Sequence, residues 1–280
     1  MVLKGHGTEN DFVLIPDPDG ALSLNAPLVR ALCDRHAGVG GDGVLRVVRS
    51  ENDPDGKEFA DRAEFFMDYR NADGSVAEMC GNGIRVFLRY LQRVSVVEDS
   101  AAVATRGGIV RARSRADGDI SADMGLPQVL ADRPVATVAP GITARPAVAA
   151  VRMPNPHVVV EVGSDELDAL DLSRPPEIDP ALPDGQNVEF ITTVGDRHLR
   201  MRVHERGVGE TRSCGTGICA AVAAAATASG RAADGSTWQV DVPGGRCRVR
   251  WDAEGIELTG PAVIVAELEL DDAWLARATG

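Results

Sequence analysis

Two cysteines of this sequence open closely similar segments. Cys80 begins CGNGI and Cys214 begins CGTGI, and an apolar run that predicts a helix follows each of them. A thiol at the start of a helix lies beside unpaired N–H groups and the positive end of the helix dipole, which predicts a lowered pKa and an available thiolate. The same N–H groups bind carboxylate oxygens. Each segment therefore predicts an acid/base group next to an anion-binding site.

Two such groups together indicate one type of reaction, the inversion of the α-carbon of an amino acid. One group removes a proton from one face of the carbon, and the other delivers a proton to the opposite face. The two helix starts would share the negative charge that develops on the substrate. Lys4 and Lys57 are the only lysines, and neither lies in a pyridoxal-binding motif. We therefore expect chemistry without a cofactor.

Composition narrows the class of partner. The chain has 42 acidic and 29 basic residues and a net charge of −13, with the acidic residues spread along it. This balance disfavours nucleic acid and anionic membranes and favours a small polar ligand. The apolar run CAAVAAAATA is far shorter than the roughly 20 residues of a membrane span, and the N-terminus has no apolar signal core. We expect a cytoplasmic protein.

The other cysteines suggest no further chemistry. Cys33, Cys219 and Cys247 bring the total to five, an odd number without C-x-x-C spacing. That pattern fits neither a secreted disulfide framework nor a metal site. We expect reduced thiols that fill the core, and no bound metal.

The elements that must position the two cysteines repeat along the chain. Each half alternates many short β-like runs with one dominant helix, at about 81–94 and 215–229. This recurrence predicts an α+β fold with two pseudo-symmetric lobes that arose by duplication. We place the N-terminal lobe at 1–124, completed by a final strand at 266–280, and the C-terminal lobe at 125–265. The Pro- and Ala-rich segment 124–146 is the expected connection.

One glycine-rich segment imitates a nucleotide site. GVGGDG at 38–43 fits the G-x-G-x-x-G pattern of dinucleotide-binding proteins. That motif follows a strand and precedes a helix, whereas here a helix-like segment precedes and a strand-like segment follows. We therefore interpret it as a tight loop that uses glycine at positive φ.

Several polar stretches accompany the cysteines. NADGSVAEMCGNGIR, NPH, ERGVGETRSCGTG, VPGGRCRVRW and LTGPAV occur in this order along the chain. In these residues the sequence resembles the diaminopimelate epimerase family nearly from end to end. The resemblance implies two lobes, each a barrel-like, mostly antiparallel sheet around a central helix, with the active site in the cleft between them. It also implies the cofactor-independent conversion of LL- to meso-diaminopimelate for lysine and cell-wall synthesis. We expect diaminopimelate as the small-molecule substrate and a homodimer.

The resemblance also assigns roles. Cys80 and Cys214 would be the acid/base pair, with Cys214 as proton acceptor and Cys80 as donor in the LL-to-meso direction. His157 and Glu205 would be polar partners that tune the thiols. The residues expected to bind substrate are Asn10, Asn71, Gly81, Asn82, Asn155, Asn187, Glu205, Arg206, Gly215 and Thr216. Asparagine, glutamate and arginine supply the acceptors and donors that a zwitterion needs.

Two positions depart from the family pattern. Many members carry Gln where this chain has Gly43, which would remove one contact to the distal end of the substrate. Pro154 replaces a glycine that often precedes NPH. Neither change touches the thiols.

Three other functions fit parts of the sequence. A racemase of the same fold acting on histidine, proline or hydroxyproline would need fewer polar groups than Asn71, Asn187 and Arg206 provide. A cysteine hydrolase, in which one of the two cysteines pairs with His157, would leave the second cysteine segment unexplained. A redox sensor would join the two thiols in a reversible disulfide.

Overall fold

The computed structural model describes residues 1–137 and 144–279. These residues form two compact units. Unit 1 comprises Met1–Ala122 and the described residues from Pro261 onward, and unit 2 comprises Asp123–Gly260. Residues 138–143 of the predicted connection lie outside the described part of the chain. Within that part, no helix has the length and apolar character needed to cross a bilayer.

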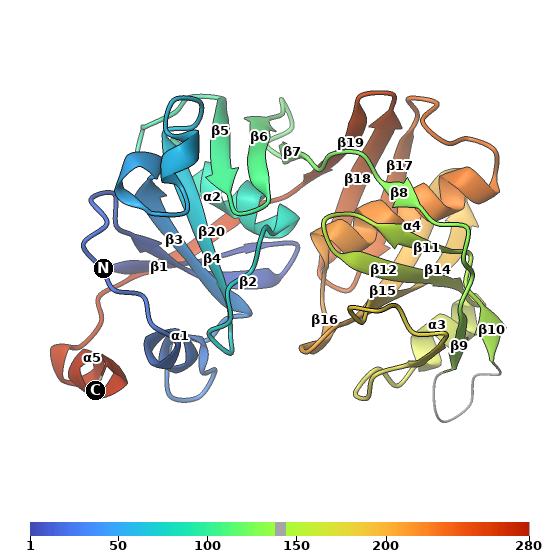
Figure 1. The fold of residues 1–280 in the computed structure, drawn as a ribbon, viewed down its shortest axis with the longest axis horizontal. Coiled ribbons are helices and arrows are strands. Elements are labelled where there is room, and N and C mark those ends of the chain that lie inside the picture. The colour runs from blue at the N-terminus through green and yellow to red at the C-terminus, as the bar shows by residue number, and fades with distance from the viewer. Residues whose placement is uncertain (138–143, 280) are drawn as a thin grey trace. The chain divides into compact units, whose positions relative to one another are not determined.

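Unit 1 is built on one sheet (Figure 1). Its strands, in spatial order, are β20 (Val263–Leu268), β1 (Val2–Gly7), β2 (Asn10–Pro16), β3 (Gly43–Arg49), β4 (Phe65–Asn71), β5 (Ser100–Thr105), β6 (Gly108–Ser114) and β7 (Ile120–Asp123). The β2–β3 and β4–β5 pairs are parallel, and all the others in this series are antiparallel.

Unit 2 repeats this arrangement. Its main strands, in spatial order, are β8 (Gln128–Val129), β11 (Ala149–Arg152), β12 (Pro156–Glu161), β14 (Asn187–Gly195), β15 (His198–Glu205), β17 (Thr237–Val242), β18 (Gly245–Asp252) and β19 (Gly255–Gly260). The β12–β14 and β15–β17 pairs are parallel, and the others in this series are antiparallel. The order of parallel and antiparallel pairs is therefore the same as in unit 1, which confirms the predicted duplication.

Smaller elements complete the units. In unit 2, β16 (Gly209–Thr211) pairs with the end of β15, and β9 (Val135–Thr137), β10 (Arg145–Pro146) and β13 (Glu177–Asp179) form a separate small sheet. Helix α1 (Ala26–Cys33) connects β2 to β3, and α3 (Ser164–Ala169) connects β12 to β14. Two single-turn 3₁₀ helices, Ser50–Asn52 and Lys57–Phe59, follow β3.

Each sheet surrounds one helix that begins directly after a cysteine. Helix α2 (Gly81–Arg93) contacts β1, β3, β4, β5, β6 and β20, and α4 (Gly215–Ala228) contacts β11, β12, β14, β15, β18 and β19. The α4 sequence is rich in alanine, which favours a helix and leaves little side-chain bulk to separate it from the surrounding strands. The predicted fold class, with a central helix in each of two repeats, is confirmed.

Helix α2 is more deeply buried than its sequence suggests. The spacing of Ile84, Phe87, Leu88 and Leu91 predicts an apolar stripe with Arg85 away from it. Arg85 is instead 0% exposed. Its guanidinium donates to Thr8 Oγ1 at 3.1 Å and to the Pro261 carbonyl at 2.9 Å, and it also donates to Asn82 Oδ1. These bonds offset the cost of burying the charge.

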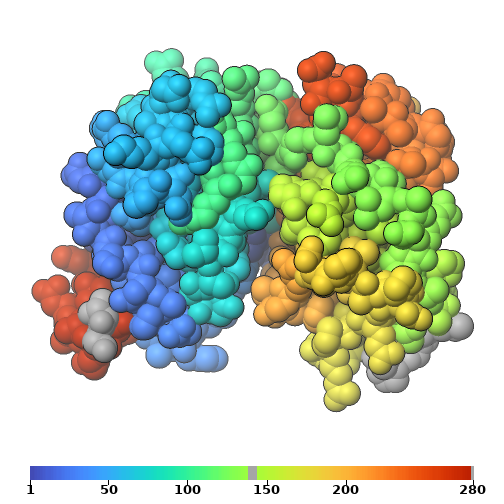
Figure 2. All heavy atoms as spheres, viewed as in Figure 1, coloured from blue at the N-terminus to red at the C-terminus, as the bar shows by residue number. Residues whose placement is uncertain are grey.

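The C-terminal end differs from the predicted strand at 266–280. Strand β20 ends at Leu268, and α5 (Asp272–Thr279) follows and packs against α1 (Figures 1 and 2). Asp271 Oδ1 accepts a hydrogen bond from Trp274 N at 2.9 Å, and Trp274 Nε1 donates to Ala37 O at 3.0 Å. The strand prediction beyond Leu268 is wrong. The apolar side chains of α5, Trp274, Leu275 and Ala278, follow helical spacing and pack against the core beneath α1.

The glycine-rich segment at 38–43 connects α1 to β3, as its flanking sequences predicted. Gly40 has a φ of +78°, a conformation that favours glycine. The interpretation as a tight loop is confirmed.

Candidate active site

Cys80 lies in unit 1 at the N-cap of α2. Its backbone is extended, with φ −143° and ψ 117°, and its sulfur accepts a hydrogen bond from the Gly83 N–H at 3.4 Å. The thiol also lies 3.8 Å from Asn10 Oδ1. The thiol is half-buried. The helix start therefore directs one backbone donor at the sulfur, as the sequence predicted.

A cluster of polar side chains holds the Asn10 amide, which lies next to this thiol. Asn82 Nδ2 donates to Asn10 Oδ1 at 3.1 Å, and Asn10 Nδ2 donates to Asp42 Oδ2 at 2.7 Å. Burial, followed by the charge of Asp11, raises the pKa of the Asp42 carboxyl. The structure thus brings Asn10, Asn82 and Cys80 together. Asn71 belongs to a different hydrogen-bonded group at the end of β4, where its amide donates to Ser75 Oγ at 3.0 Å.

Cys214 occupies the matching position in unit 2, at the N-cap of α4. Its φ of −121° and ψ of 115° resemble those of Cys80, and its sulfur accepts from the Gly217 N–H at 3.4 Å. Thr216 Oγ1 lies 3.5 Å from the same sulfur. Gly81 and Gly215 are the first residues of their helices, so their N–H groups have no acceptor within the helix.

The pKa of Cys214 is shifted in the direction opposite to the one predicted. Burial is the main cause and raises the pKa well above that of an ordinary thiol, and the negative charges of Glu205 and Glu189 raise it further. The hydrogen bonds from Thr216 and from the Gly217 N–H act in the opposite direction but do not outweigh them. The predicted thiolate is wrong for Cys214 because only 5% of the residue is exposed.

A buried pair of ionisable side chains lies beside this helix start. His157 Nδ1 and Glu189 Oε1 are 2.7 Å apart, and both side chains are 0% exposed. His157 Nε2 lies 2.9 Å from Asn155 Oδ1. The structure therefore joins two of the predicted residues, His157 and Asn155, through one imidazole ring.

The remaining predicted residues of unit 2 gather where β14 begins and β15 ends. Asn187 Oδ1 accepts from the Arg206 N–H at 2.9 Å, and Asn187 Nδ2 donates to the Pro156 carbonyl at 3.3 Å. The Arg206 guanidinium donates to the Asp184 carbonyl. The Glu205 carboxylate accepts from the Thr211 hydroxyl. Hydrogen bonds therefore connect Asn187 with the backbone of Arg206 and hold the Glu205 side chain on β16.

Three residues of these clusters escaped the sequence analysis. Asp42 lies in the glycine-rich loop, Arg85 looks like a surface residue of a helix, and Glu189 stands in the strand segment NVEF. The only sign of Glu189 in the sequence is that it is a single acidic residue between two apolar ones, Val188 and Phe190. Its importance depends on the pairing of β12 with β14, which no local pattern specifies.

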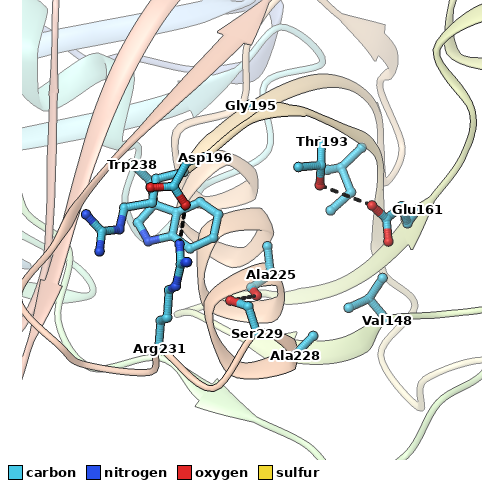
Figure 3. Close-up of a pocket in the computed structure, with 12 residues that line it drawn as sticks. Val148, Glu161, Thr193, Gly195, Asp196, Ala225, Ala228, Ser229, Arg231 and Trp238 are labelled. Carbon is cyan, nitrogen blue, oxygen red and sulfur yellow. Dashed lines mark hydrogen bonds and ion pairs between the residues drawn. The ribbon is translucent and has the colours of Figure 1, made fainter.

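A separate hollow of about 410 Å³ lies in unit 2 at the far end of α4 from Cys214 (Figure 3). Ala225, Ala228 and Trp238 line it, and Arg231 forms an ion pair with Asp196 at its edge. It contains none of the predicted catalytic or binding residues. Among the described residues, no group of three or more His, Cys, Asp or Glu side chains is arranged to hold a metal ion.

Similar solved structures define the class of fold. A probable proline racemase from Agrobacterium radiobacter K84 matches 96% of this chain and 93% of its own, with a TM-score of 0.67 and 18% identity. A phenazine biosynthesis protein of the PhzF family from Bacillus anthracis matches 96% and 98%, with a TM-score of 0.66 and 18% identity. The chain thus has the duplicated fold of these proteins.

Sequence comparison identifies the family within that fold. A model of the family described as Diaminopimelate epimerase matches residues 2–130 and 149–265. Diaminopimelate epimerase of Streptomyces coelicolor is 55% identical over 98% of this chain and 96% of its own length. The enzyme of the same name from Thermobifida fusca is 52% identical over 94% and 95%. The chain belongs to the diaminopimelate epimerase family and is an isomerase, as the motifs indicated.

Proposed function

We propose that this protein interconverts LL- and meso-diaminopimelate with Cys80 and Cys214 as its two acid/base groups. The proposal rests chiefly on the paired helix starts, in which each sulfur accepts an N–H bond at 3.4 Å from the glycine three residues later. Two equivalent thiols on two equivalent helices supply the two groups that inversion of a stereocentre requires. The proposed substrate is the one for which the family is named.

The proton balance of the reaction is simple. One cysteine, as thiolate, takes the α-proton, and its sulfur becomes a thiol while the electron pair of the C–H bond moves into the substrate carboxylate. The other cysteine, as thiol, gives its proton to the opposite face of the α-carbon and becomes a thiolate. The product leaves an enzyme whose proton has moved from one sulfur to the other. That form is ready for the reverse reaction, or it resets by exchange with water.

The surrounding polar groups fit this reaction. The carboxylate at the reacting centre is bound by the N–H groups of Gly81 and Gly215 and by the neighbouring Asn82 and Thr216. Glu205 and Arg206 bind amino and carboxylate groups of the substrate. Recognition of the two amino-acid heads is completed by Asn10, Asn71, Asn155 and Asn187. His157 orients Asn155 through the bond at 2.9 Å.

A raised pKa at Cys214 has a consequence for direction. In the free enzyme Cys214 rests as a thiol, which makes it the donor for substrate of the meso configuration. To act as the acceptor in the LL-to-meso direction it must first lose its proton. An ammonium group bound beside Glu205 favours that loss, because it offsets a negative charge that raises the pKa of Cys214.

The experiment that tests the proposal follows proton exchange and epimerisation together. Reduced protein is incubated with LL-diaminopimelate in deuterated water, beside Cys80→Ala and Cys214→Ala variants. We expect the meso product to carry deuterium at the inverted carbon. We expect each variant to lose roughly 10²- to 10⁴-fold or more of the epimerisation rate.

Other outcomes would reject defined parts of the proposal. Exchange with proline or histidine but not with diaminopimelate would reject the substrate and keep the chemistry. Full epimerisation by either alanine variant would reject the two-thiol mechanism. We further propose a cytoplasmic enzyme, in which the five cysteines stay reduced, and a homodimer, which sedimentation analysis tests directly.

A further inference from the structure

We propose that Glu189 is a positioning residue of this enzyme, which orients His157 and places a buried negative charge beside the first turn of α4 so that Cys214 rests as a thiol. This inference deepens the proposed function and rests on it for the role of Cys214. Glu189 was not among the residues that the sequence motifs assigned. Its case depends on burial, on fit and on a comparison within the molecule.

The first argument is the state of the Glu189 carboxyl group. Oε1 bonds to His157 Nδ1 at 2.7 Å, while Oε2 is buried without a hydrogen-bond partner among the described residues. Because an ionised carboxylate only accepts hydrogen bonds, Nδ1 carries the hydrogen of this bond and the negative charge stays on Glu189. The bond to Glu189 therefore fixes both the direction of the imidazole ring and its arrangement of protons. Such an arrangement is costly to bury for packing alone.

The second argument is the fit of Glu189 against α4. A Cβ atom added to Gly217 would lie only 2.6 Å from Glu189 Oε1 and 3.2 Å from its Cδ. The N–H of the same glycine donates to Cys214 Sγ at 3.4 Å. The absence of a side chain at Gly217 thus lets the carboxylate lie against the turn that holds the thiol. One residue, Gly217, separates the carboxylate of Glu189 from the sulfur of Cys214.

The third argument comes from the duplicated fold. Phe12 pairs with Gly43 in β2–β3, as His157 pairs with Asn187 in β12–β14. Two residues further along, Leu45 in unit 1 therefore takes the place of Glu189 in unit 2. A Cβ added to Gly83 would lie 3.2 Å from Leu45 Cδ2, which confirms the equivalence.

The two repeats thus solve the same packing problem in different ways. Unit 1 fills the place with a phenylalanine and a leucine that are both 0% exposed, and unit 2 fills it with an imidazole and a carboxyl group that are equally buried. Apolar side chains are sufficient to build the repeat. The buried carboxylate of unit 2 is therefore not required to build the repeat, and it lies against the turn that holds Cys214.

Electrostatics give the same sign. After burial itself, the charges of Glu205 on β15 and Glu189 on β14 are the causes that raise the pKa of Cys214, and His157 on β12 is the ionisable group bonded to Glu189. A like charge nearby disfavours the thiolate. Removing the charge of Glu189 while keeping its shape should therefore release the proton of Cys214 at lower pH.

The test is a titration of Cys214 that needs no substrate. Thiolate absorbance in the ultraviolet is recorded against pH for the whole protein and for its Cys214→Ala variant, and the difference isolates Cys214. The same pair is prepared with Glu189→Gln. We expect Cys214 to titrate about one pH unit lower in the Glu189→Gln protein than in the parent protein, a roughly tenfold higher thiolate-to-thiol ratio at fixed pH.

Three controls separate this effect from a general disturbance. The titration of Cys80 is obtained in the same way, as the difference between a protein and its Cys80→Ala variant. This titration should be the same with and without Glu189→Gln. Glu161→Gln, a charge removal at the exposed end of β12, should leave Cys214 unchanged. The double variant His157→Phe, Glu189→Leu installs the residues of unit 1, and apolar replacement of a buried pair commonly preserves folding. It should shift Cys214 in the same direction as Glu189→Gln.

The outcomes are distinct from those of the proposed function. A Cys214 titration that coincides in the parent, Glu189→Gln and double variants would overturn the inference, even if activity fell. A shift in Cys214 in a protein that does not epimerise diaminopimelate would keep the inference about Glu189 and reject the substrate. In the active enzyme, the kcat–pH profile of Glu189→Gln should also move, and an unchanged profile with only lower thermal stability would mark a structural role.

Discussion

The two cysteine helix starts share a backbone and differ in their surroundings. Cys80 and Cys214 are both extended N-cap residues whose sulfurs accept an N–H bond at 3.4 Å. Cys80 is half-buried beside asparagine amides, whereas Cys214 is buried beside two carboxylates. Duplication thus preserved the backbone geometry at the two helix starts, while the side chains around each sulfur came to differ.

This difference suits a reaction that needs one thiol and one thiolate. Two thiols with equal pKa values would tend to be both protonated or both ionised at a given pH, and neither state supplies one thiol and one thiolate. In the proposed mechanism the raised pKa of Cys214 favours the arrangement in which Cys214 holds the proton. The proposed mechanism therefore makes use of the difference between the two units.

The strongest test of the comparison replaces each thiol by a hydroxyl. Cys80→Ser and Cys214→Ser keep the N-cap acceptor, so both variants should fold, but a serine is far harder to ionise than a cysteine. We expect each to lose roughly 10²- to 10⁴-fold in kcat. Steady-state rates in both directions measure the effect, and retention of activity in one variant would contradict a shared role.

The next prediction compares Arg85 in α2 with Cys219 in α4. The two residues are equivalent, because each lies at the same distance along the chain from the N-cap cysteine of its helix. Arg85→Met leaves the Pro261 carbonyl and the Thr8 hydroxyl without their donor. We expect it to destabilise the protein by about 2–4 kcal/mol, because buried polar groups lose their partner. Cys219→Ala removes one small buried sulfur and should cost about 1 kcal/mol. Urea unfolding compares the two, and equal losses would refute this account.

A smaller effect contrasts the glycines that face the two sulfurs. Gly217→Ala forces its Cβ to within 2.6 Å of Glu189 Oε1, whereas Gly83→Ala meets Leu45 at 3.2 Å. We expect Gly217→Ala to destabilise by about 1–3 kcal/mol through overpacking. Gly83→Ala should stay within about 1 kcal/mol of the parent, because the gain in helix propensity offsets a milder contact. Denaturation midpoints and kcat for both variants check this order.

The smallest effect concerns a thiol outside either site. Burial raises the pKa of Cys33 to about 12. A raised folded-state pKa stabilises the protein at low pH, and that contribution is lost as the pH rises from the ordinary thiol value towards 12. We expect thermal stability to fall less steeply over this range in Cys33→Ala than in the parent. Parallel slopes in calorimetry would show that Cys33 does not contribute.

Much of the site was readable from the sequence because its signals are local. The two C-G-x-G-I segments place a cysteine, two glycines and a helix start within five residues, and helix capping depends on little else. The sequence also predicted the repeat, since each half carries its own strands and central helix. Asn10, Asn82, Asn155 and His157 were assigned by resemblance, and hydrogen bonds join the first two within unit 1 and the last two within unit 2.

Other features escaped because they depend on residues far apart in the chain. The end of the chain was predicted as a strand, yet Trp274 bonds to Ala37 and its helix covers the core beneath α1. Arg85 looked like a surface residue because its acceptor at Pro261 lies 176 positions away. A local pattern contains no information about such partners.

The sequence by itself determined the two N-cap cysteines, the helices that follow them and the duplicated order of elements, because capping, helix propensity and apolar periodicity act within a few residues. The tertiary structure alone decided the direction in which the pKa of Cys214 is shifted. The pKa of Cys214 depends on its burial and on Glu189 and Glu205, which reach it from two different strands. Burial and Coulomb interactions act through space, so only the packed chain sets them.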